Sequence, residues 1–377
     1  MRTERISNDG LDPLAGTAYR TIAELGAGGM GLVIEAEHRR LRKRVCVKLL
    51  RHGPASTEHV DRMQLEAQSL AALDGHPNVV LATDFGEAPD GRPFLVMERL
   101  HGRTLLEERN ARGSLPAIEA IGLVCQVLAA LEAAHALGVI HRDIKPGNLF
   151  VCNARGSAAR VVKVLDFGAA KLANGDDAAP SPVPHRAMQT AQGMVIGSPR
   201  YMAPEQVIMA SQVDHRVDLY AAGAVLFFLL TGRGPFDDRK DHVAIIFAQL
   251  HDTPPTPSTL AAHPIPKALD DAVLRALAKD PDDRFPDARS FAAELSRIAC
   301  EMRTATESTR GLSANERAAS APVHRTPIAA EEPTMLSKVF VTVADAGATA
   351  DRTTWWIAAA SAVLGAVLGL YLLGVLR

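Results

Sequence analysis

A short run of glycines near the N-terminus has the spacing of a phosphate-binding loop. Residues 25–33 read LGAGGMGLV, in which Gly26, Gly28 and Gly31 follow the pattern G-x-G-x-x-G. Glycines at these positions let backbone amides approach phosphate oxygens with no side chain in between. Dinucleotide-binding folds share this spacing, so the loop alone leaves two nucleotide-binding chemistries open.

The residues after the loop distinguish these two chemistries. A dinucleotide site requires a helix directly after the last glycine and an acidic residue about 20 positions further on. Here the alternating segment LVIEAEH is followed by the charged turn RRLRKR and the apolar run VCVKLL, and position 51 is arginine. Two such segments around a turn predict a β-hairpin. We therefore expect the glycine loop to cap a hairpin.

Lys48 is the single cation within the apolar run VCVKLL. A lysine in such a strand is often an edge residue that extends its amine to solvent. Otherwise it needs an anion on the buried side, which is either a phosphate or a carboxylate. Glu66, in the helix-like segment MQLEAQSLAAL, is the candidate carboxylate. A pair between Lys48 and Glu66 would hold the ammonium group toward a nucleotide.

The glycine loop, the hairpin and the Lys48–Glu66 pair resemble the protein kinase family. Two further motifs carry the resemblance. Residues 141–148 read HRDIKPGN and match the kinase pattern H-R-D-x-x-x-x-N at every specified position, and DFG follows at 166–168. The resemblance covers residues 19–300, about three quarters of the chain. It implies an α+β, bilobal protein kinase fold, with a β-rich N-terminal lobe and a helical C-terminal lobe.

The resemblance also implies a site for phosphoryl transfer from ATP, with Mg²⁺ as the metal and Mn²⁺ as an alternative. Asp143 would align the attacking hydroxyl, and Lys145 would reach the γ-phosphate. Asn148 and Asp166 would supply oxygen ligands for the metal. The ATP pocket would be formed by Leu25, Gly26, Ala27, Gly28, Gly29, Met30, Gly31, Val33, Cys46, Lys48, Glu66, Met97, Glu98 and Leu100.

Within this pocket, the family match gives Met97 the position at the back of the adenine site and the backbone of 98–100 the role of the hinge. Cys46 is a departure, because the family commonly has alanine against the adenine ring. Cysteine is small and apolar, so we expect the pocket still to accept adenine.

Three further matches concern support rather than chemistry. The segment GSPRYMAPE at 197–205 matches the platform for the peptide substrate. Asp218 matches the buried aspartate that braces the catalytic loop. Arg284 matches the arginine that pairs with the glutamate of APE, here Glu205.

The nature of the acceptor hydroxyl follows from the same resemblance. Lys145 and the hydroxyl of Ser198 are typical of kinases with serine and threonine substrates, and the chain is most similar to eukaryotic-like (Hanks-type) bacterial serine/threonine protein kinases. Arg142 before the catalytic aspartate is typical of kinases whose activation segment is ordered by phosphorylation. Thr190 is the candidate phosphosite, and the other interpretation is that it is an ordinary solvated hydroxyl.

Two other classes of function are alternatives to an active kinase. A pseudokinase scaffold would lack Lys48, Asp143, Asn148 or Asp166, and all four are present. A nicotinamide-dependent oxidoreductase is excluded by the predicted hairpin after the glycine loop and by HRDIKPGN.

Composition is consistent with a globular enzyme. The chain has 377 residues, a net charge of −2 and 47% hydrophobic residues. These values exclude a mainly disordered chain, a fibre and a polytopic membrane protein, and they give no electrostatic footprint for nucleic acid. The four cysteines form no CxxC pair, which favours a reducing compartment over a disulfide or zinc framework.

The ends of the chain differ from its middle. Residues 1–18 are expected to be a polar tail, 19–300 the kinase domain and 301–354 a disordered linker. Residues 355–376 contain no charge and would form a helix of roughly 33 Å, enough to span a bilayer. A buried core helix is the alternative. The transmembrane interpretation implies a single-pass protein of the cell membrane with a cytoplasmic kinase domain.

The expected partners are protein substrates and the membrane, without nucleic acid. A homodimer through the kinase domain or the transmembrane helix is a further expectation. Ser361, Gly365 and Gly369 recur every four residues, and such small residues permit close helix pairing in lipid.

Overall fold

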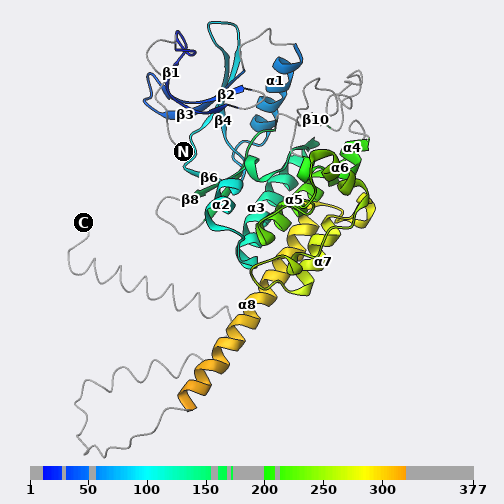
Figure 1. Ribbon diagram of the computed structural model, residues 1–377. Coiled ribbons are helices and arrows are strands. Elements are labelled where there is room, and N and C mark those ends of the chain that lie inside the picture. The colour runs from blue at the N-terminus through cyan, green and yellow to red at the C-terminus, as the bar shows by residue number, and fades with distance from the viewer. Residues whose placement is uncertain are drawn as a thin grey trace, which may run out of the picture. The chain divides into compact units, whose positions relative to one another are not determined.

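The N-terminal part of the domain is an antiparallel sheet that positions the predicted nucleotide site. The computed structural model describes residues 12–27, 31–50, 57–153, 160–167, 171–172, 199–208 and 213–319. The sheet has the strand order β1-β2-β3-β5-β4. Its strands are β1 (Tyr19–Ala27), β2 (Gly31–His38), β3 (Arg44–Leu50), β4 (Ala82–Glu87) and β5 (Pro93–Glu98). Helix α1 (Thr57–Ala72) contacts β4 and β5, and Figure 1 shows it beside the sheet.

The predicted hairpin is confirmed, since β2 pairs antiparallel with β3 from Gly31 opposite Leu50 to Glu37 opposite Arg44. Gly31 is required at its position because a Cβ atom there would overlap the carbonyl oxygen of Leu49. The hairpin therefore depends on glycine at position 31.

The two faces of β3 carry different kinds of side chain. Val45, Val47 and Leu49 are buried in a small apolar cluster on one face of the sheet. Because side chains alternate along a strand, Cys46 and Lys48 lie on the opposite face. The alternation of side chains along β3 thus places Lys48 on the face of the sheet opposite the apolar cluster.

The C-terminal part is mostly helical, and Figure 1 shows helices α2 to α7 grouped apart from the five-stranded sheet. The helices are α2 (Leu105–Arg112), α3 (Ala117–Ala136), α4 (Pro204–Ile208), α5 (Arg216–Thr231), α6 (His242–His251), α7 (Lys267–Ala276) and α8 (Ala288–Ala319). The short strands are β6 (Gly102–Thr104), β7 (Val139–Ile140), β8 (Leu149–Asn153), β9 (Arg160–Val164) and β10 (Lys171–Leu172). They form a three-stranded sheet, β6-β8-β9, and a two-stranded one, β10-β7. This arrangement confirms the predicted α+β, bilobal fold.

Helix α5 is the centre of the helical part. Every residue from Val217 to Leu230 is buried, and α5 contacts both α3 and α7. A helix that is apolar on all sides must be surrounded by other elements. The burial of α5 therefore fixes where the helices around it can pack.

Helix α3 is the one helix among the described residues that is long and apolar enough to cross a membrane. Ten of its side chains, including Leu128 and Leu131, are buried in the main core. It is therefore a core helix of the domain. The predicted transmembrane segment 355–376 lies outside the described residues.

Two expected boundaries differ from the structure. Leu14, which the sequence analysis assigns to the tail, is fully buried in the cluster of the N-terminal sheet. Residues 301–319, assigned to the disordered linker, continue α8 as a helix. Once a helix is nucleated, each further residue adds a hydrogen bond, so an alanine-, glutamate- and arginine-rich segment extends it at little cost.

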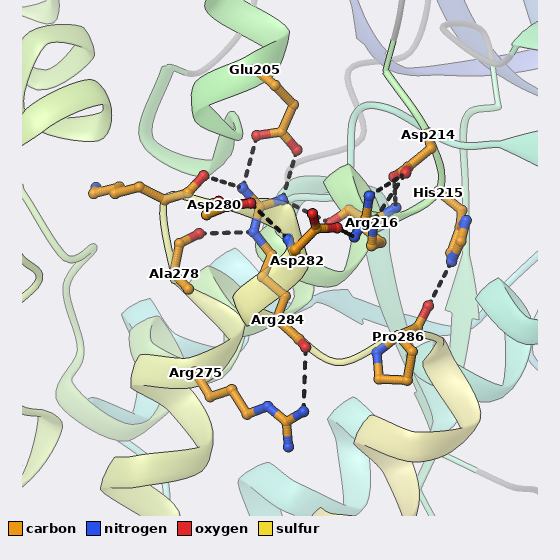
Figure 2. Close-up of polar contacts among 11 residues, drawn as sticks. Glu205, Asp214, His215, Arg216, Arg275, Ala278, Asp280, Asp282, Arg284 and Pro286 are labelled. Atoms are coloured by element: carbon orange, nitrogen blue, oxygen red, sulfur yellow. Dashed lines mark hydrogen bonds and ion pairs between the residues drawn. The ribbon is translucent and has the colours of Figure 1, made fainter.

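A buried arginine, Arg284, contacts several segments of the helical part, and Figure 2 shows its polar contacts. The Arg284 side chain is fully buried, and its Nη1 and Nη2 atoms contact the Glu205 carboxylate at 2.6 and 2.8 Å. Its guanidinium also donates to the carbonyl oxygens of Ala278, Lys279 and Arg216. The predicted pair of Arg284 with Glu205 is therefore confirmed, and it ties α4 to the segments around α5 and α7.

We expect Arg284→Met to lower the free energy of unfolding by about 3 kcal/mol, because it leaves Glu205 and three carbonyl groups without their donor. Urea unfolding followed by circular dichroism measures this loss. The matched control is Arg297→Met, which removes the exposed ion pairs of Arg297 with Glu294 and Glu301 on α8 and should leave stability unchanged. Equal losses in both variants would contradict the structural role of Arg284.

Candidate functional site

Lys48 lies between two carboxylates that come from different parts of the chain. Its Nζ atom is 2.8 and 2.7 Å from the two oxygens of Glu66, on α1, and 3.0 Å from Oδ1 of Asp166. The side chains of Lys48 and Glu66 are only 11% and 3% exposed. The predicted Lys48–Glu66 pair is therefore confirmed, and the alternative of a solvent-facing edge lysine is excluded.

This buried arrangement sets the charges of the three groups. Burial opposes the charge of Lys48, but the carboxylates of Glu66 and Asp166 outweigh it and raise the pKa of the amine. Burial raises the pKa of Glu66 to about 7, although Lys48 acts in the opposite direction. Lys48 is thus a firmly charged ammonium group, whereas Glu66 titrates near neutral pH.

A second set of polar groups surrounds Asp143. Lys145 donates to Oδ2 of Asp143 at 2.6 Å, and Nδ2 of Asn148 donates to the same oxygen at 3.0 Å. Asn148 also donates to the carbonyl oxygen of Asp143 at 2.9 Å. The Asp143 side chain is 32% exposed. The structure therefore brings the predicted residues Asp143, Lys145 and Asn148 together, with Asp143 open to a substrate.

The loop that carries Asp143 is held in place by hydrogen bonds to Asp218, which lies in the first turn of α5. Asp218 Oδ2 accepts hydrogen bonds from the backbone N–H of His141 and from the ring of His135, and Oδ1 accepts one from the N–H of Arg142. Burial opposes its charge, but the hydrogen bonds from His135 and His141 outweigh this and lower the pKa of Asp218. The predicted bracing role of Asp218 is confirmed.

The backbone of this loop is strained at one position. Arg142 has a φ of 65°, in the left-handed region that non-glycine residues rarely adopt. The hydrogen bond from its N–H to Asp218 measures 2.8 Å and compensates for this conformation. Asp218 thereby fixes the orientation of the catalytic loop.

Asp166 is placed beside this loop by β9. The N–H of Leu165 donates to the carbonyl oxygen of Asn148 at 2.8 Å, and His141 Nε2 lies 3.0 Å from the carbonyl oxygen of Leu165. The rings of His141 and Phe167 pack with centroids 4.6 Å apart. These contacts hold Leu165 and Phe167, on either side of Asp166, next to His141 and Asn148.

The amide and carboxylate of Asn148 and Asp166 fit a magnesium site. Both side chains offer an oxygen atom as a metal ligand. The hydrogen bond between Leu165 and Asn148 keeps Asp166, the next residue, close to Asn148. Among the described residues, no group of three or more His, Cys, Asp and Glu side chains could hold a metal ion. Magnesium characteristically uses one or two protein ligands together with substrate phosphates. The donor set therefore suits an ion that arrives with a nucleotide.

Apart from Glu66 on α1, the described pocket residues lie on the strands of the N-terminal sheet and just beyond them. Val33 pairs with Lys48, and Cys46 pairs with Met97, so these side chains lie along neighbouring strands. Burial raises the pKa of the Cys46 thiol to about 11, which keeps it neutral. Leu25, Gly26, Ala27 and Gly31 lie on β1 and β2, and Glu98 and Leu100 at the end of β5 and after it. Gly28, Gly29, Met30 and Thr190 lie outside the described residues.

Two residues with a role in the site were not anticipated from the sequence. His135 donates to Asp218, and Asn78 holds β9 through a hydrogen bond from its Nδ2 to the carbonyl oxygen of Val162. The backbone around Asn78 pairs with Val164, two residues before Asp166. A signal for His135 was present, because it is the one histidine in the apolar segment 117–136.

The comparisons with known proteins agree with this geometry. Residues 19–295 match the family model described as protein kinase domain. The chain is 41% identical over 311 residues to serine/threonine-protein kinase pkn3 of Myxococcus xanthus, with 81% of this chain and 54% of that protein covered. It is 40% identical over 304 residues to serine/threonine-protein kinase PksC of Streptomyces coelicolor, with 78% and 51% covered.

Among solved structures, the crystal structure of the Mycobacterium tuberculosis PknI kinase domain matches with a TM-score of 0.56 and 27% identity. The match covers 76% of this chain and 99% of that one. The chain spans about half the length of the curated relatives named above. Because the family model, the relatives and the site agree, the chain belongs to the protein kinase family, and its domain is a serine/threonine protein kinase domain of the bacterial Hanks type.

Proposed function

We propose that this chain is an active serine/threonine protein kinase that transfers the γ-phosphate of ATP to hydroxyl groups of proteins, itself included. The observation that carries the proposal is the contact of Lys48 with both Glu66 and Asp166. It joins the residue that would hold ATP phosphates to the residue that would hold the metal. A pseudokinase scaffold would not need to keep both halves of this arrangement.

The chain's own residues divide the work of phosphoryl transfer. Among the described residues, the side chains that donate to Asp143 use Oδ2, so Oδ1 is available to accept the hydrogen bond of a substrate hydroxyl. Lys145 lies beside it and supplies positive charge where the transferred phosphate gains negative charge. Lys48 would bind the remaining phosphates, and Glu66 holds its ammonium group in position.

Asn148 and Asp166 would hold Mg²⁺, which when bound neutralises phosphate charge. Mn²⁺ offers the same chemistry to these oxygen donors. Met97, Cys46 and the backbone of 98–100 would surround the adenine ring, because β3 and β5 are adjacent at this point. The N-terminal sheet thus supplies the nucleotide site, and the helical part supplies the acceptor site.

Activation by phosphorylation at Thr190 is supported by the surroundings of Arg142. Its Nε atom is buried and has no hydrogen-bond partner among the residues that the structure describes. Burial lowers the pKa of Arg142, although Asp218 acts in the opposite direction. A partly buried cation with an unused donor is stabilised by an added anion. A phosphate on the activation segment would provide one.

We also propose membrane anchoring through residues 355–376, with 320–354 as the linker and the kinase domain in the cytoplasm. This rests on the 22 uncharged residues of the segment, which fit the thickness of a bilayer. Pairing of two chains through Ser361, Gly365 and Gly369 would bring two kinase domains close enough to phosphorylate each other.

The central test is autophosphorylation of the full chain with ATP and magnesium. We expect Lys48→Met and Asp166→Asn each to reduce ³²P incorporation by at least about 100-fold, because each removes a charge that phosphoryl transfer requires. Thermal unfolding shows whether the variants are folded. Lys267→Met is the matched control, since Lys267 is 85% exposed, and it should retain activity. Full incorporation by a folded Asp166→Asn variant would refute the proposed function.

The second prediction concerns Thr190. Mass spectrometry of active protein should find phosphate on Thr190, and Thr190→Ala should lower the phosphorylation of an added protein substrate by about tenfold. Arg142→Gln should lower activity similarly, and Thr190→Ala should have little further effect in that background. Full activity of protein that carries no phosphate on Thr190 would contradict this prediction.

The third prediction is a pH dependence. Protonation of Glu66 removes the charge that holds Lys48, and its pKa is about 7. The kcat/KM for ATP should therefore be constant above this pH and fall as the pH decreases through it, by about tenfold per unit at the acid end. Glu66→Gln should be less active at high pH and lack this acid limb. ATP ionises equally in both assays, so a limb of the same size in both proteins would contradict the role of Glu66.

A further inference from the structure

The turn between β2 and β3 exposes an aliphatic side chain among cations. Residues 39–44, here called the basic turn, read RRLRKR and are all exposed, with Leu41 72% exposed. The N–H of His38 donates to the carbonyl oxygen of Lys43, and the N–H of Arg42 to that of His38, which closes the turn. Arg42 has a φ of 57°. Leu41 therefore lies within a turn that backbone hydrogen bonds hold closed.

The positive charge of the basic turn is only partly neutralised by the protein. Arg39 pairs with Asp12 at 3.5 Å, Arg42 with Glu37 at 3.0 Å and Arg44 with Glu35 at 3.4 Å. These three arginines therefore have carboxylate partners within the domain.

Arg40 and Lys43 differ from these arginines. Neither forms an ion pair with any residue that the structure describes. The basic turn is therefore a site of excess positive charge on a chain whose net charge is −2.

We propose that the basic turn binds the surface of an anionic membrane. A bilayer interface takes up an aliphatic side chain at the acyl boundary while lipid phosphates contact the surrounding cations. Nucleic acid would also attract Arg40 and Lys43, but it would leave Leu41 in water. The combination of Leu41 with unpaired cations therefore favours lipid. The inference rests on the proposed membrane anchor, which would keep the domain near such a surface.

The contact is compatible with catalysis because of where the turn lies on the hairpin. β2 extends over eight residues from Gly31, next to the glycine loop, to His38, next to the basic turn. At about 3.3 Å per residue, the seven steps between the two ends of β2 place them roughly 23 Å apart. A membrane at the basic turn would therefore leave the glycine loop and the nucleotide site away from the lipid.

The experiment is hydrogen–deuterium exchange of the full chain in lipid nanodiscs, read at peptides that cover residues 38–45. Discs of phosphatidylcholine are compared with discs that contain one-third phosphatidylglycerol. We expect exchange in the basic turn to be slowed about tenfold in the anionic discs only. Arg40→Glu combined with Lys43→Glu, and separately Leu41→Ser, should abolish this protection. Both variants should keep their autophosphorylation in detergent, because these residues lie outside the catalytic site.

Two matched controls test the location of the contact. Val243→Ser removes an apolar side chain on α6 that is 70% exposed, and Lys267→Glu reverses a cation that is 85% exposed. Both should keep the protection. Equal exchange in the two kinds of disc, or equal loss in the controls, would overturn the proposal. Protection by an added oligonucleotide in neutral discs, without a lipid effect, would overturn it in favour of nucleic acid.

Different results would contradict the proposed anchor and the proposed membrane contact of the basic turn. A chain that does not enter discs contradicts the anchor, and the same exchange measurement with vesicles of the two lipid compositions then decides on the turn. A chain that enters both discs with an unprotected turn contradicts the turn alone.

Discussion

A carboxylate without access to solvent must be surrounded by hydrogen-bond donors, and Asp218 obtains two of these donors from the segment that carries Asp143. It is fully buried at the start of α5 and accepts bonds from the N–H groups of His141 and Arg142 and from His135. Leaving such a charge unpaired would cost several kcal/mol. The catalytic loop therefore has one favourable conformation, including the positive φ of Arg142. The position of Asp143 depends on this constraint.

The second constraint is the buried contact of Lys48 with Glu66 and Asp166. These residues come from β3, from α1 and from the segment after β9, so one ammonium group connects three segments that are distant in the sequence. The apolar contacts differ, because the outer face of the N-terminal sheet has a cluster of its own while α1 belongs to the main core. Polar contacts thus fix the relative position of Lys48, Glu66 and Asp166, which we propose to bind the nucleotide and the metal. Such contacts are directional, which suits a site that must hold charges in line.

The apolar composition of a segment does not decide whether it lies in the core of the domain or in a membrane. Helix α3 is long and apolar enough to span a membrane, yet its buried side chains place it in the core of the domain. Residues 355–376 have a similar composition, and their role as an anchor remains a prediction. The difference between the two segments lies in what surrounds them, and tertiary packing alone supplies that information.

The amino-acid sequence was sufficient to identify the family and the hairpin after the glycine loop, and it predicts which residues form the site. It did so because phosphoryl transfer needs particular side chains, and because glycine, strand alternation and the HRDIKPGN and DFG motifs are local properties. The pairing of Lys48 with Glu66 was predictable from a cation in an apolar strand.

The tertiary structure decided what depends on distant neighbours. Only packing shows that His135 bonds to Asp218, that Asn78 holds β9, and that Leu14 belongs to the core. Burial also set the pKa of Glu66 near 7, since desolvation depends on the surrounding atoms and not on the residue type. The helix that continues to Ala319 was missed because cooperative extension from residue 288 outweighs a weak local preference.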